Sequence, residues 1–210
     1  MSIAESPIFG HMSKSMANFT VYTLNGKNIV RSKAFMPKDP KSKKQLAVRS
    51  RIAALGKQYR MLSPILCLGF PENSDNKTPQ NMFVAANFST AFELLDEQPV
   101  LQYPLMLISK GSLPELSVTD AALDAQGITI SYDATALLPE MTGFDEIIAF
   151  AMMKNGALHI VKQILGFVTT GSVFLKLKDK EDEEVACCYV FVRSGDGKKS
   201  SNSVFVEVNT

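Results

Sequence analysis

The sequence predicts an α+β protein in which an N-terminal β-hairpin and two helices precede a C-terminal β-sandwich. Three observations lead to this prediction. An Asn-Gly pair separates two alternating segments near the N-terminus, apolar residues recur at helical spacing between residues 42 and 97, and short strand-like segments separated by glycines follow Pro104. We therefore divide the 210 residues into a basic hairpin-arm-helix module over 1–103 and a β-sandwich over 104–210.

The predicted hairpin covers Asn18–Lys33. Its first strand alternates over Phe19–Leu24, and the pair Asn25-Gly26 then favours a tight two-residue turn because both positions tolerate positive φ. Pro37 and Pro40 follow. Proline has no N–H to donate and disfavours helix in the residue before it, so we expect an extended arm at this point.

The first predicted helix covers Ser42–Leu62, and Pro64 is expected to end it. Its apolar residues recur at spacings of three and four and form one stripe: Val48, Ile52, Leu55, Tyr59 and Leu62. Gly56 costs about 1 kcal/mol relative to Ala inside a helix, so we expect another part of the backbone to approach it closely.

The second predicted helix covers Pro79–Glu97, with Thr78 as its N-cap and Pro79 in the favoured first position. Apolar residues cover most of its circumference, so we expect it to be buried on several sides.

The chain after Pro104 is predicted to form short antiparallel strands. We expect them over Leu105–Ser109, Leu116–Val118, Ile128–Asp133, Glu146–Met153, Leu158–Val161, Val168–Lys178, Val185–Arg193 and Val204–Val208. Asn155-Gly156 marks a second tight hairpin. Seven or eight strands with turns about every 8–12 residues favour a β-sandwich.

The segment from Tyr189 to Val206 resembles the last hairpin of immunoglobulin and fibronectin type III-like sandwiches. In those domains a tyrosine near the start of the penultimate strand forms the tyrosine corner, and a glycine-containing turn leads to a serine-rich final strand. The resemblance implies this role for Tyr189. The chain has no Trp, and Tyr132 is expected in place of the usual core Trp.

The whole chain from about residue 9 is similar to a family of Bacteroidetes proteins that has no established activity. The similarity rests on an ordered set of marks: Asn25-Gly26-Lys27 to Arg31, the Lys/Pro-rich arm, Gln45 to Arg51, Leu62-Ser63-Pro64, Gly69-Phe70, Lys77-Thr78-Pro79, Ser109 to Pro114, and Gly197 with Ser203-Val204. It implies an architecture and no chemistry.

The net charge of +1 hides a strong asymmetry along the chain. Residues 1–60 contain 12 Lys and Arg but 2 Asp and Glu, a charge of +10, whereas the other 150 residues contain 10 and 19, a charge of −9. Such a chain can attract an anionic partner or stack head-to-tail on copies of itself. The alternative is that the basic stretch lies against acidic surface of the same molecule.

The basic arm and first helix form the candidate partner-binding site. Its residues are Lys27, Arg31, Lys33, Lys38, Lys41, Lys43, Lys44, Arg49, Arg51, Lys57 and Arg60. These cations could neutralise phosphates, and Phe35, Tyr22 and Tyr59 could stack on bases, although no sequence motif of a nucleic-acid-binding fold is present.

Chemistry-bearing motifs are missing. His11 and His159 have no partner at metal-ligand spacing, Cys67 lies in an apolar run typical of a core, and Cys187 and Cys188 point to opposite faces of one strand. The acidic run over 178–184 lacks the central glycine of a calcium loop and predicts a solvated turn. Phosphate-binding loops and catalytic triads are absent, so we expect no enzyme, no metal and no cofactor.

These observations predict a non-enzymatic structural or interaction protein that belongs to a larger assembly, such as a phage virion, and docks through its basic N-terminal module. Protein partners or self-association are expected. The alternatives are a sequence-independent nucleic-acid-binding protein and, from the sandwich alone, a carbohydrate- or cell-surface-binding module. The N-terminus lacks the pattern of a signal peptide, and no apolar run reaches about 18 residues, so we expect a cytoplasmic or virion-associated protein without a membrane span.

Overall fold

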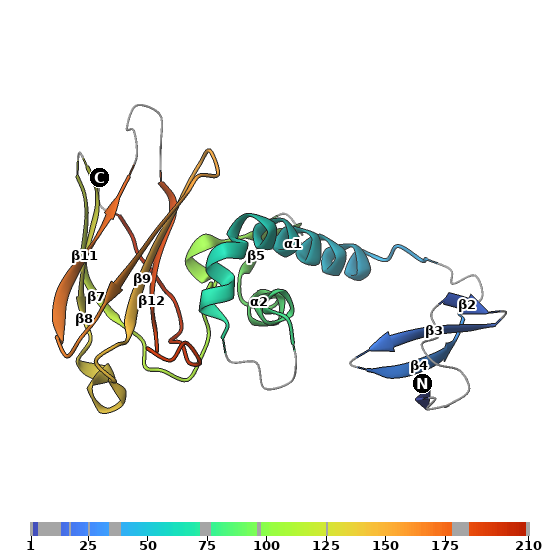
Figure 1. Cartoon of the computed structure of the whole chain (residues 1–210). Coiled ribbons are helices and arrows are strands. Elements are labelled where there is room, and N and C mark those ends of the chain that lie inside the picture. The colour runs from blue at the N-terminus through green and yellow to red at the C-terminus, as the bar shows by residue number, and fades with distance from the viewer. Residues whose placement is uncertain are drawn as a thin grey trace. The chain divides into compact units, whose positions relative to one another are not determined.

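The protein is an α+β protein with a few helices and many antiparallel strands (Figure 1). The structure, a computed structural model, describes residues 2–3, 14–16, 18–24, 26–33, 39–71, 77–95, 98–124, 126–177 and 185–208. The chain divides into two compact units, Met1–Ser42 and Lys43–Thr210.

The first unit contains one antiparallel sheet of four strands in the order β1-β4-β3-β2. The strands are β1 (Ser2–Ile3), β2 (Lys14–Met16), β3 (Phe19–Leu24) and β4 (Lys27–Ser32). The pairing of β3 with β4 begins at Leu24 and Lys27, next to Gly26, whose φ of +76° suits the glycine of a tight turn. Val21 and Ile29 are the buried apolar residues of this pair.

Helix α1 (Lys43–Gly69) opens the second unit and is longer than predicted, because it continues past Pro64 to Gly69. Proline removes one hydrogen bond from a helix and costs about 3 kcal/mol. The turns around it bury Leu62, Ile65 and Leu66, and this burial offsets the cost. The expectation for Gly56 was also wrong, since a Cβ built there would meet no atom within 4 Å.

Helix α2 (Pro79–Asn87) begins as predicted, with Thr78 accepting a 3.3 Å hydrogen bond from the Asn81 backbone N–H. It ends ten residues earlier than predicted. The buried Asn87 side chain exchanges two hydrogen bonds with the backbone of Leu107, at 2.7 and 2.8 Å, and so fixes the helix end against a distant segment. The rest of the predicted helix contains a turn and strand β5 (Phe92–Leu95), which pairs with β6 (Gln98–Leu101) just beyond the predicted end.

Seven further antiparallel strands form two sheets. Strands β7 (Ser117–Leu123), β8 (Gly127–Asp133) and β11 (Thr170–Lys176) have the order β11-β8-β7, and strands β9 (Glu146–Met153), β10 (Leu158–Ile164), β12 (Val185–Arg193) and β13 (Val204–Phe205) have the order β10-β9-β12-β13. The predicted turn at Asn155-Gly156 is confirmed between β9 and β10, with a Gly156 φ of +87°. The predicted strand Leu105–Ser109 was wrong: Leu105 closes a 3₁₀ turn, η1 (Tyr103–Leu105), and a second one, η2 (Thr135–Glu140), follows β8.

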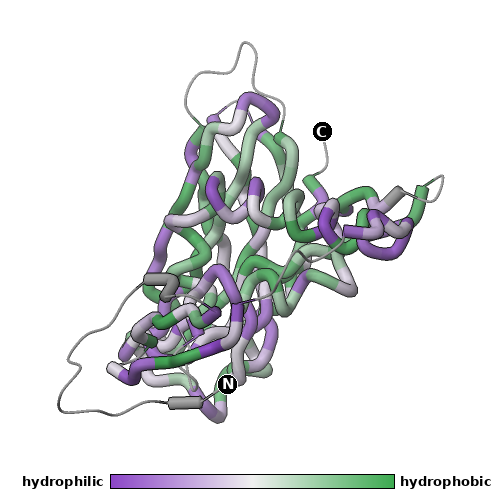
Figure 2. Tube along the Cα trace, turned by 90° about the vertical axis from the view of Figure 1, so that its right-hand side faces the viewer, coloured by the Kyte–Doolittle hydropathy of each residue, from purple (hydrophilic) through white to green (hydrophobic). Residues whose placement is uncertain are grey.

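Two hydrophobic cores cover the two faces of the β10-β9-β12-β13 sheet. The first core lies between the two sheets and includes Ile130, Val173 and Val190. The second lies between the same sheet and the helices and includes Leu62, Phe83 and Phe150. Because both faces of β9 and β12 are covered, these strands are hydrophobic along nearly their whole length. Figure 2 colours the whole chain by hydropathy.

The second core explains why the observed units do not follow the predicted boundary between residues 103 and 104. The helices share a core with the sheet and belong to the unit Lys43–Thr210, so the division falls before α1. Buried polar contacts strengthen the connection. The Gly69 carbonyl oxygen, at the end of α1, lies 2.9 Å from Ser109 Oγ, 3.1 Å from Ser200 Oγ and 3.1 Å from the Lys110 backbone nitrogen.

Tyr189 does not form the predicted tyrosine corner. Its side chain lies in the second core, stacked on Phe150 with ring centroids 6.1 Å apart, and its hydroxyl donates a 2.7 Å hydrogen bond to the Tyr103 carbonyl, 86 residues away. A tyrosine corner bonds to backbone only a few residues upstream. Tyr132 is buried in the first core, as expected for a residue in place of a core Trp.

Candidate functional site

The predicted cations of the first unit lie at its surface. Lys27, Arg31, Lys33 and Lys41 are exposed, and the Arg31 guanidinium lies 5.8 Å from the centroid of the Tyr22 ring, a cation–π arrangement. Lys38 and Phe35 fall outside the described residues. These cations are therefore presented to solvent, Lys27 and Arg31 on β4 and Lys33 and Lys41 in the segments after it.

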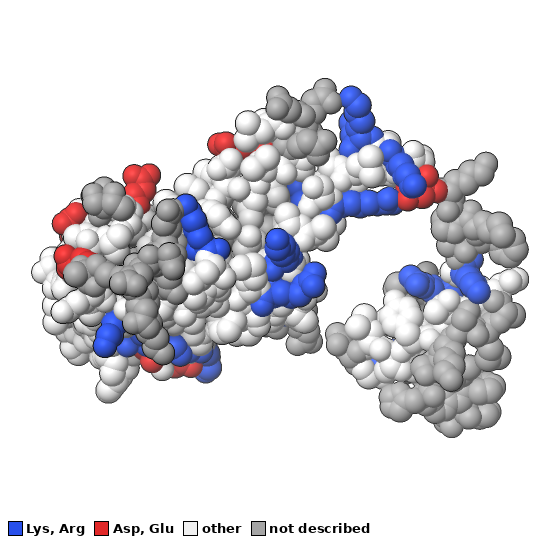
Figure 3. Space-filling view, turned by 90° about the horizontal axis from the view of Figure 1, so that it is seen from above, with Lys and Arg blue, Asp and Glu red and all other residues white. Residues whose placement is uncertain are grey.

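Five of the predicted cations are exposed on α1, and Figure 3 shows Lys and Arg side chains spaced along this helix: Lys43, Lys44, Arg49, Lys57 and Arg60. At 100° per residue, Arg49 and Arg60 fall on nearly the same line of the helix surface, opposite the buried line of Leu55 and Leu62. Arg60 Nε lies 3.4 Å from the Gly56 carbonyl oxygen. From Leu55 onward the helix thus buries one face, while Arg49 and Arg60 lie on the opposite side.

Arg51 is the predicted site residue of α1 that the structure buries in part, against two aromatic rings. Its guanidinium lies 5.7 Å from the ring centroid of Phe88 and 5.6 Å from that of Phe92, and Nη1 lies 3.5 Å from the Phe88 carbonyl oxygen. The side chain is half-buried. We therefore assign Arg51 to the packing of α1 against the region after α2.

The first turns of α1 also expose apolar side chains. Leu46, Val48 and Ile52 are between 43% and 49% exposed. The predicted stripe placed Val48 and Ile52 on the face toward the core, but the buried part of this stripe begins at Leu55. Tyr59, on the same stripe, packs against the second core and offers no free ring for stacking. The N-terminal part of α1, residues 43–53, therefore exposes apolar and cationic side chains, with Arg51 as the packed exception; we call it the open segment of α1.

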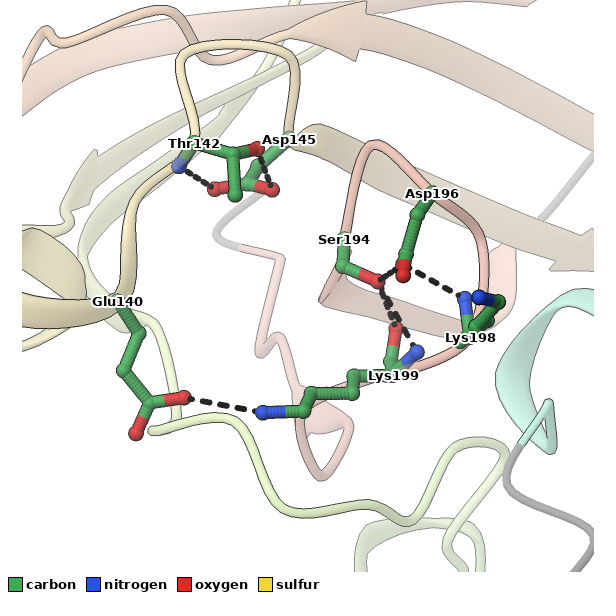
Figure 4. A network of polar contacts seen from close by, with 7 residues as sticks. All are labelled: Glu140, Thr142, Asp145, Ser194, Asp196, Lys198 and Lys199. Atoms are coloured by element: carbon green, nitrogen blue, oxygen red, sulfur yellow. Dashed lines mark hydrogen bonds and ion pairs between the residues drawn. The ribbon is translucent and has the colours of Figure 1, made fainter.

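A different cluster, which the sequence did not reveal, lies where three loops meet at one end of the two sheets. Asp145, only 4% exposed, is its centre. Its carboxylate accepts hydrogen bonds from the Thr142 backbone N–H at 2.9 Å and from the Thr142 hydroxyl at 2.7 Å (Figure 4). It also accepts one from the Gly195 backbone N–H at 3.0 Å. The Asp145 carbonyl accepts from the Leu165 N–H at 2.7 Å. Asp145 thereby connects the loops before β9, after β10 and after β12.

The loop between β12 and β13 is ordered by its own polar contacts. Ser194 Oγ donates to Asp196 at 2.6 Å, the Lys198 backbone N–H donates to the same carboxylate at 3.0 Å, and the Lys199 N–H donates to Ser194 Oγ at 3.0 Å. The Ser194 hydrogen bond is the main cause that lowers the pKa of Asp196 below its usual value. An ion pair of 3.8 Å between Lys199 and Glu140 connects this loop to η2.

Large apolar side chains project from the same loops. Phe144 is 75% exposed and Phe167 is 73% exposed, and Ile164, Val168 and Leu138 nearby are also exposed. The Phe167 ring covers Gly143, where a Cβ would approach it to 2.7 Å, and Phe144 lies against Gly195. We call this set the loop-end patch. In the sequence, only the turn-forming residues of the segment Thr142-Gly-Phe-Asp145 indicated a loop at this position.

A groove of about 560 Å³ lies between the edge strands of the two sheets. One wall is β7 with the residues before it, and the other is β13 with the residues after it. The apolar side chains of Leu116, Ala121 and Val206 line it together with three exposed carboxylates, Glu115, Asp120 and Glu207, and no Lys or Arg is among the described residues that line it.

The cysteines occupy two different environments. Cys187 and Cys188 are buried on opposite faces of β12, one in each core, as predicted. Burial raises the pKa of each thiol to about 12. Cys67 is exposed on α1, and its prediction as a core residue was wrong because Leu62, Ile65, Leu66 and Gly69 take the buried face of that turn.

This difference predicts the thiol chemistry of the folded protein. At neutral pH a disulfide-exchange reagent such as dithionitrobenzoate should label Cys67 rapidly and leave Cys187 and Cys188 unlabelled. The two buried side chains are shielded from the reagent, and their raised pKa keeps them in the unreactive thiol form. In denaturant all three should react. Rapid labelling of three thiols in the native protein would contradict the buried placement, and the variant Cys67→Ser provides the blank.

The described residues show no metal centre: they contain no group of three or more His, Cys, Asp or Glu side chains placed to hold a metal ion. His159 lies on β10, half-buried, while His11 and the acidic run over 178–184 fall outside the described residues. Among the described helices, none combines the length and the apolar character needed to cross a membrane.

Comparisons with protein-family models, with curated proteins and with solved structures found no match to this chain. The similarity to the Bacteroidetes family therefore stays a prediction from the sequence.

Proposed function

We propose that this protein is a non-catalytic interaction protein that joins a larger assembly, such as a phage virion, through its basic N-terminal part. The open segment of α1 carries this proposal. It exposes Leu46, Val48 and Ile52 beside Lys43 and Lys44, whereas an isolated helix of about 12 residues is only marginally stable in water. A partner that covers the apolar side chains and supplies carboxylates would stabilise it.

The open segment favours a protein partner over a nucleic acid. Apolar side chains gain from burial against a matching apolar surface, but they gain little against a phosphate backbone. Arg51, Phe88 and Phe92 are occupied with one another, so this part of α1 does not offer a free aromatic surface for bases. The proposed partner is therefore a protein with an apolar groove and an acidic rim.

The C-terminal part is proposed to be an immunoglobulin or fibronectin type III-like sandwich that supplies a second contact. Seven antiparallel strands in sheets of three and four around a shared core support this fold. The loop-end patch lies on loops ordered by Asp145 and Lys199, and contiguous exposed apolar side chains mark interaction surfaces. Two surfaces on different elements suit a component that contacts more than one neighbour.

The proposal can be tested by gradient sedimentation from the native source. The tagged full-length chain should migrate with a large particle and form photo-cross-links to one partner from a position on the open segment. The variant Val48→Asp/Ile52→Asp should shift to the position of the free chain, because two buried charges in an apolar interface weaken binding by about 100-fold or more.

The matched control is Leu94→Asp, which changes an exposed apolar residue on β5, outside the open segment, and should leave the sedimentation unchanged. A wild-type chain that sediments alone would contradict the proposal. Release of the particle by nuclease, together with salt-sensitive retention on plain DNA or RNA, would instead establish the sequence-independent nucleic-acid-binding alternative.

A further inference from the structure

We propose that the groove between β7 and β13 binds the basic first unit of a second copy of this chain, so that copies associate head to tail. This inference goes beyond the proposed function, because it assigns a different surface and names its partner. It does not depend on the open segment of α1.

The groove lies between the edge strands of the two sheets. Strands β7 and β13 are each the last strand of their sheet, so in the described part of the chain each offers one backbone edge to a further strand. The two segments are held together only at their start, by the parallel bridge between Leu113 and Ser201 and by a 2.8 Å hydrogen bond from Asn202 to Glu115. Beyond this point they separate and the groove opens.

The floor of the groove is continuous with the first core. Leu116, Ala121 and Val206 are nearly fully buried members of that core and also line the groove. Because the side chain of Ala121 is small, a side chain of the bound copy can approach the first core at this position. A protein surface bound over the groove would cover this apolar floor.

The negative charges of the groove favour a cationic binding partner. Glu115, Asp120 and Glu207 are exposed carboxylates, and the first unit presents Lys27, Arg31 and Lys33 on β4 and just after it. The cationic segment and the groove wall have the same length. Each spans six residue steps, Lys27 to Lys33 and Glu115 to Ala121, or about 20 Å of extended chain. β4 is an inner strand, paired with β1 and with β3, so it meets the groove through its exposed cationic side chains and not through its backbone edge. Residues 1–42 have a charge of +4 (6 Lys and Arg, 2 Asp and Glu) and residues 43–210 a charge of −3 (16 and 19), so electrostatic steering favours contact between the first unit of one copy and the second unit of another.

The test is analytical ultracentrifugation of the full-length protein over a range of concentrations. The wild type should form concentration-dependent oligomers at about 0.1 M NaCl that dissociate at about 1 M, where the Debye length falls from about 10 Å to about 3 Å. A groove variant, Glu115→Lys/Asp120→Lys/Glu207→Lys, and a front variant, Lys27→Glu/Arg31→Glu/Lys33→Glu, should each weaken association at least about tenfold.

Mixing the two variants is the decisive step. In the mixture the reversed front of one variant complements the reversed groove of the other, and the unchanged front and groove complement each other as in the wild type. The mixture should therefore form mixed oligomers that neither variant forms alone. Glu93→Lys, a reversal on β5 outside the groove, should associate like the wild type. Far-ultraviolet circular dichroism of each variant establishes that it is folded.

Two results would overturn the inference. The first is a wild type that stays monomeric at low salt, even if the charge reversals change how that monomer sediments. The second is a pair of reversed variants that do not recover association when they are mixed. The proposed function has a separate readout. Val48→Asp/Ile52→Asp should leave self-association intact while it removes the chain from the assembly, so the two proposals can fail independently.

Discussion

Substitution of Gly69 by alanine should unfold or strongly destabilise the second unit, by about 3 kcal/mol or more. Gly69 is the last residue of α1, and a Cβ built on it would lie 2.2 Å from the carbonyl oxygen of Ile108 and 3.0 Å from the Cα of Ser109. Both neighbours are buried backbone in the second core region, so neither can move cheaply. The carbonyl of Gly69 would also shift from its three donors.

Gly56 provides the matched control in the same helix. It has helical neighbours on both sides and no atom within 4 Å of a built Cβ. Gly56→Ala should therefore raise the free energy of unfolding by about 0.5–1 kcal/mol, the ordinary helix preference of alanine. Urea unfolding followed by circular dichroism measures both variants. Equal effects of the same sign would refute the close approach at Gly69.

Replacement of Asp145 by alanine should lower the free energy of unfolding by about 2–3 kcal/mol and loosen the loop-end patch. Its carboxylate holds two donors of Thr142 and the N–H of Gly195, and its burial leaves these groups without a ready water partner after truncation. Hydrogen exchange should accelerate at Gly195 and at Leu165, since both amides depend on the position of this residue.

Asp133→Ala is the control for this experiment. Asp133 also accepts bonds from a nearby threonine, Thr135, at 2.8 and 2.5 Å, but these bonds stay within one exposed turn. It should cost less stability and leave exchange at Gly195 unchanged. If Asp145→Ala is no more disruptive than Asp133→Ala, the three loops are not held together by Asp145.

Pattern alone predicted the elements that depend on local sequence. Strands β9 and β12 have the predicted bounds. Each is a run of apolar, β-branched and aromatic residues that ends at charged or turn residues, and this pattern defines both ends of a strand. The N-cap at Thr78 and the turn at Gly156 are equally local. The coarse class, α+β with mainly antiparallel strands, followed from these elements.

The elements that the sequence misplaced depend on distant partners. The extension of α1 beyond Pro64 depends on the core that Ile65 and Leu66 enter, and the early end of α2 depends on the backbone of Leu107. The cationic residues of the candidate site could be identified by charge, yet only the fold separates Arg51, which packs on two rings, from its exposed neighbours. The groove and the Asp145 cluster form between segments far apart in sequence.

The sheet β10-β9-β12-β13 is packed on both faces, and this has a mechanical consequence. Tyr189 of its central strand β12 is hydrogen-bonded to Tyr103, and the end of α1 is hydrogen-bonded to the segments at Ser109 and Ser200. Tension applied to α1 by anything that grips it would pass through buried side chains to the middle strands of the sheet. The attachment of α1 should therefore withstand a pulling force up to the point at which the β-sheets unfold.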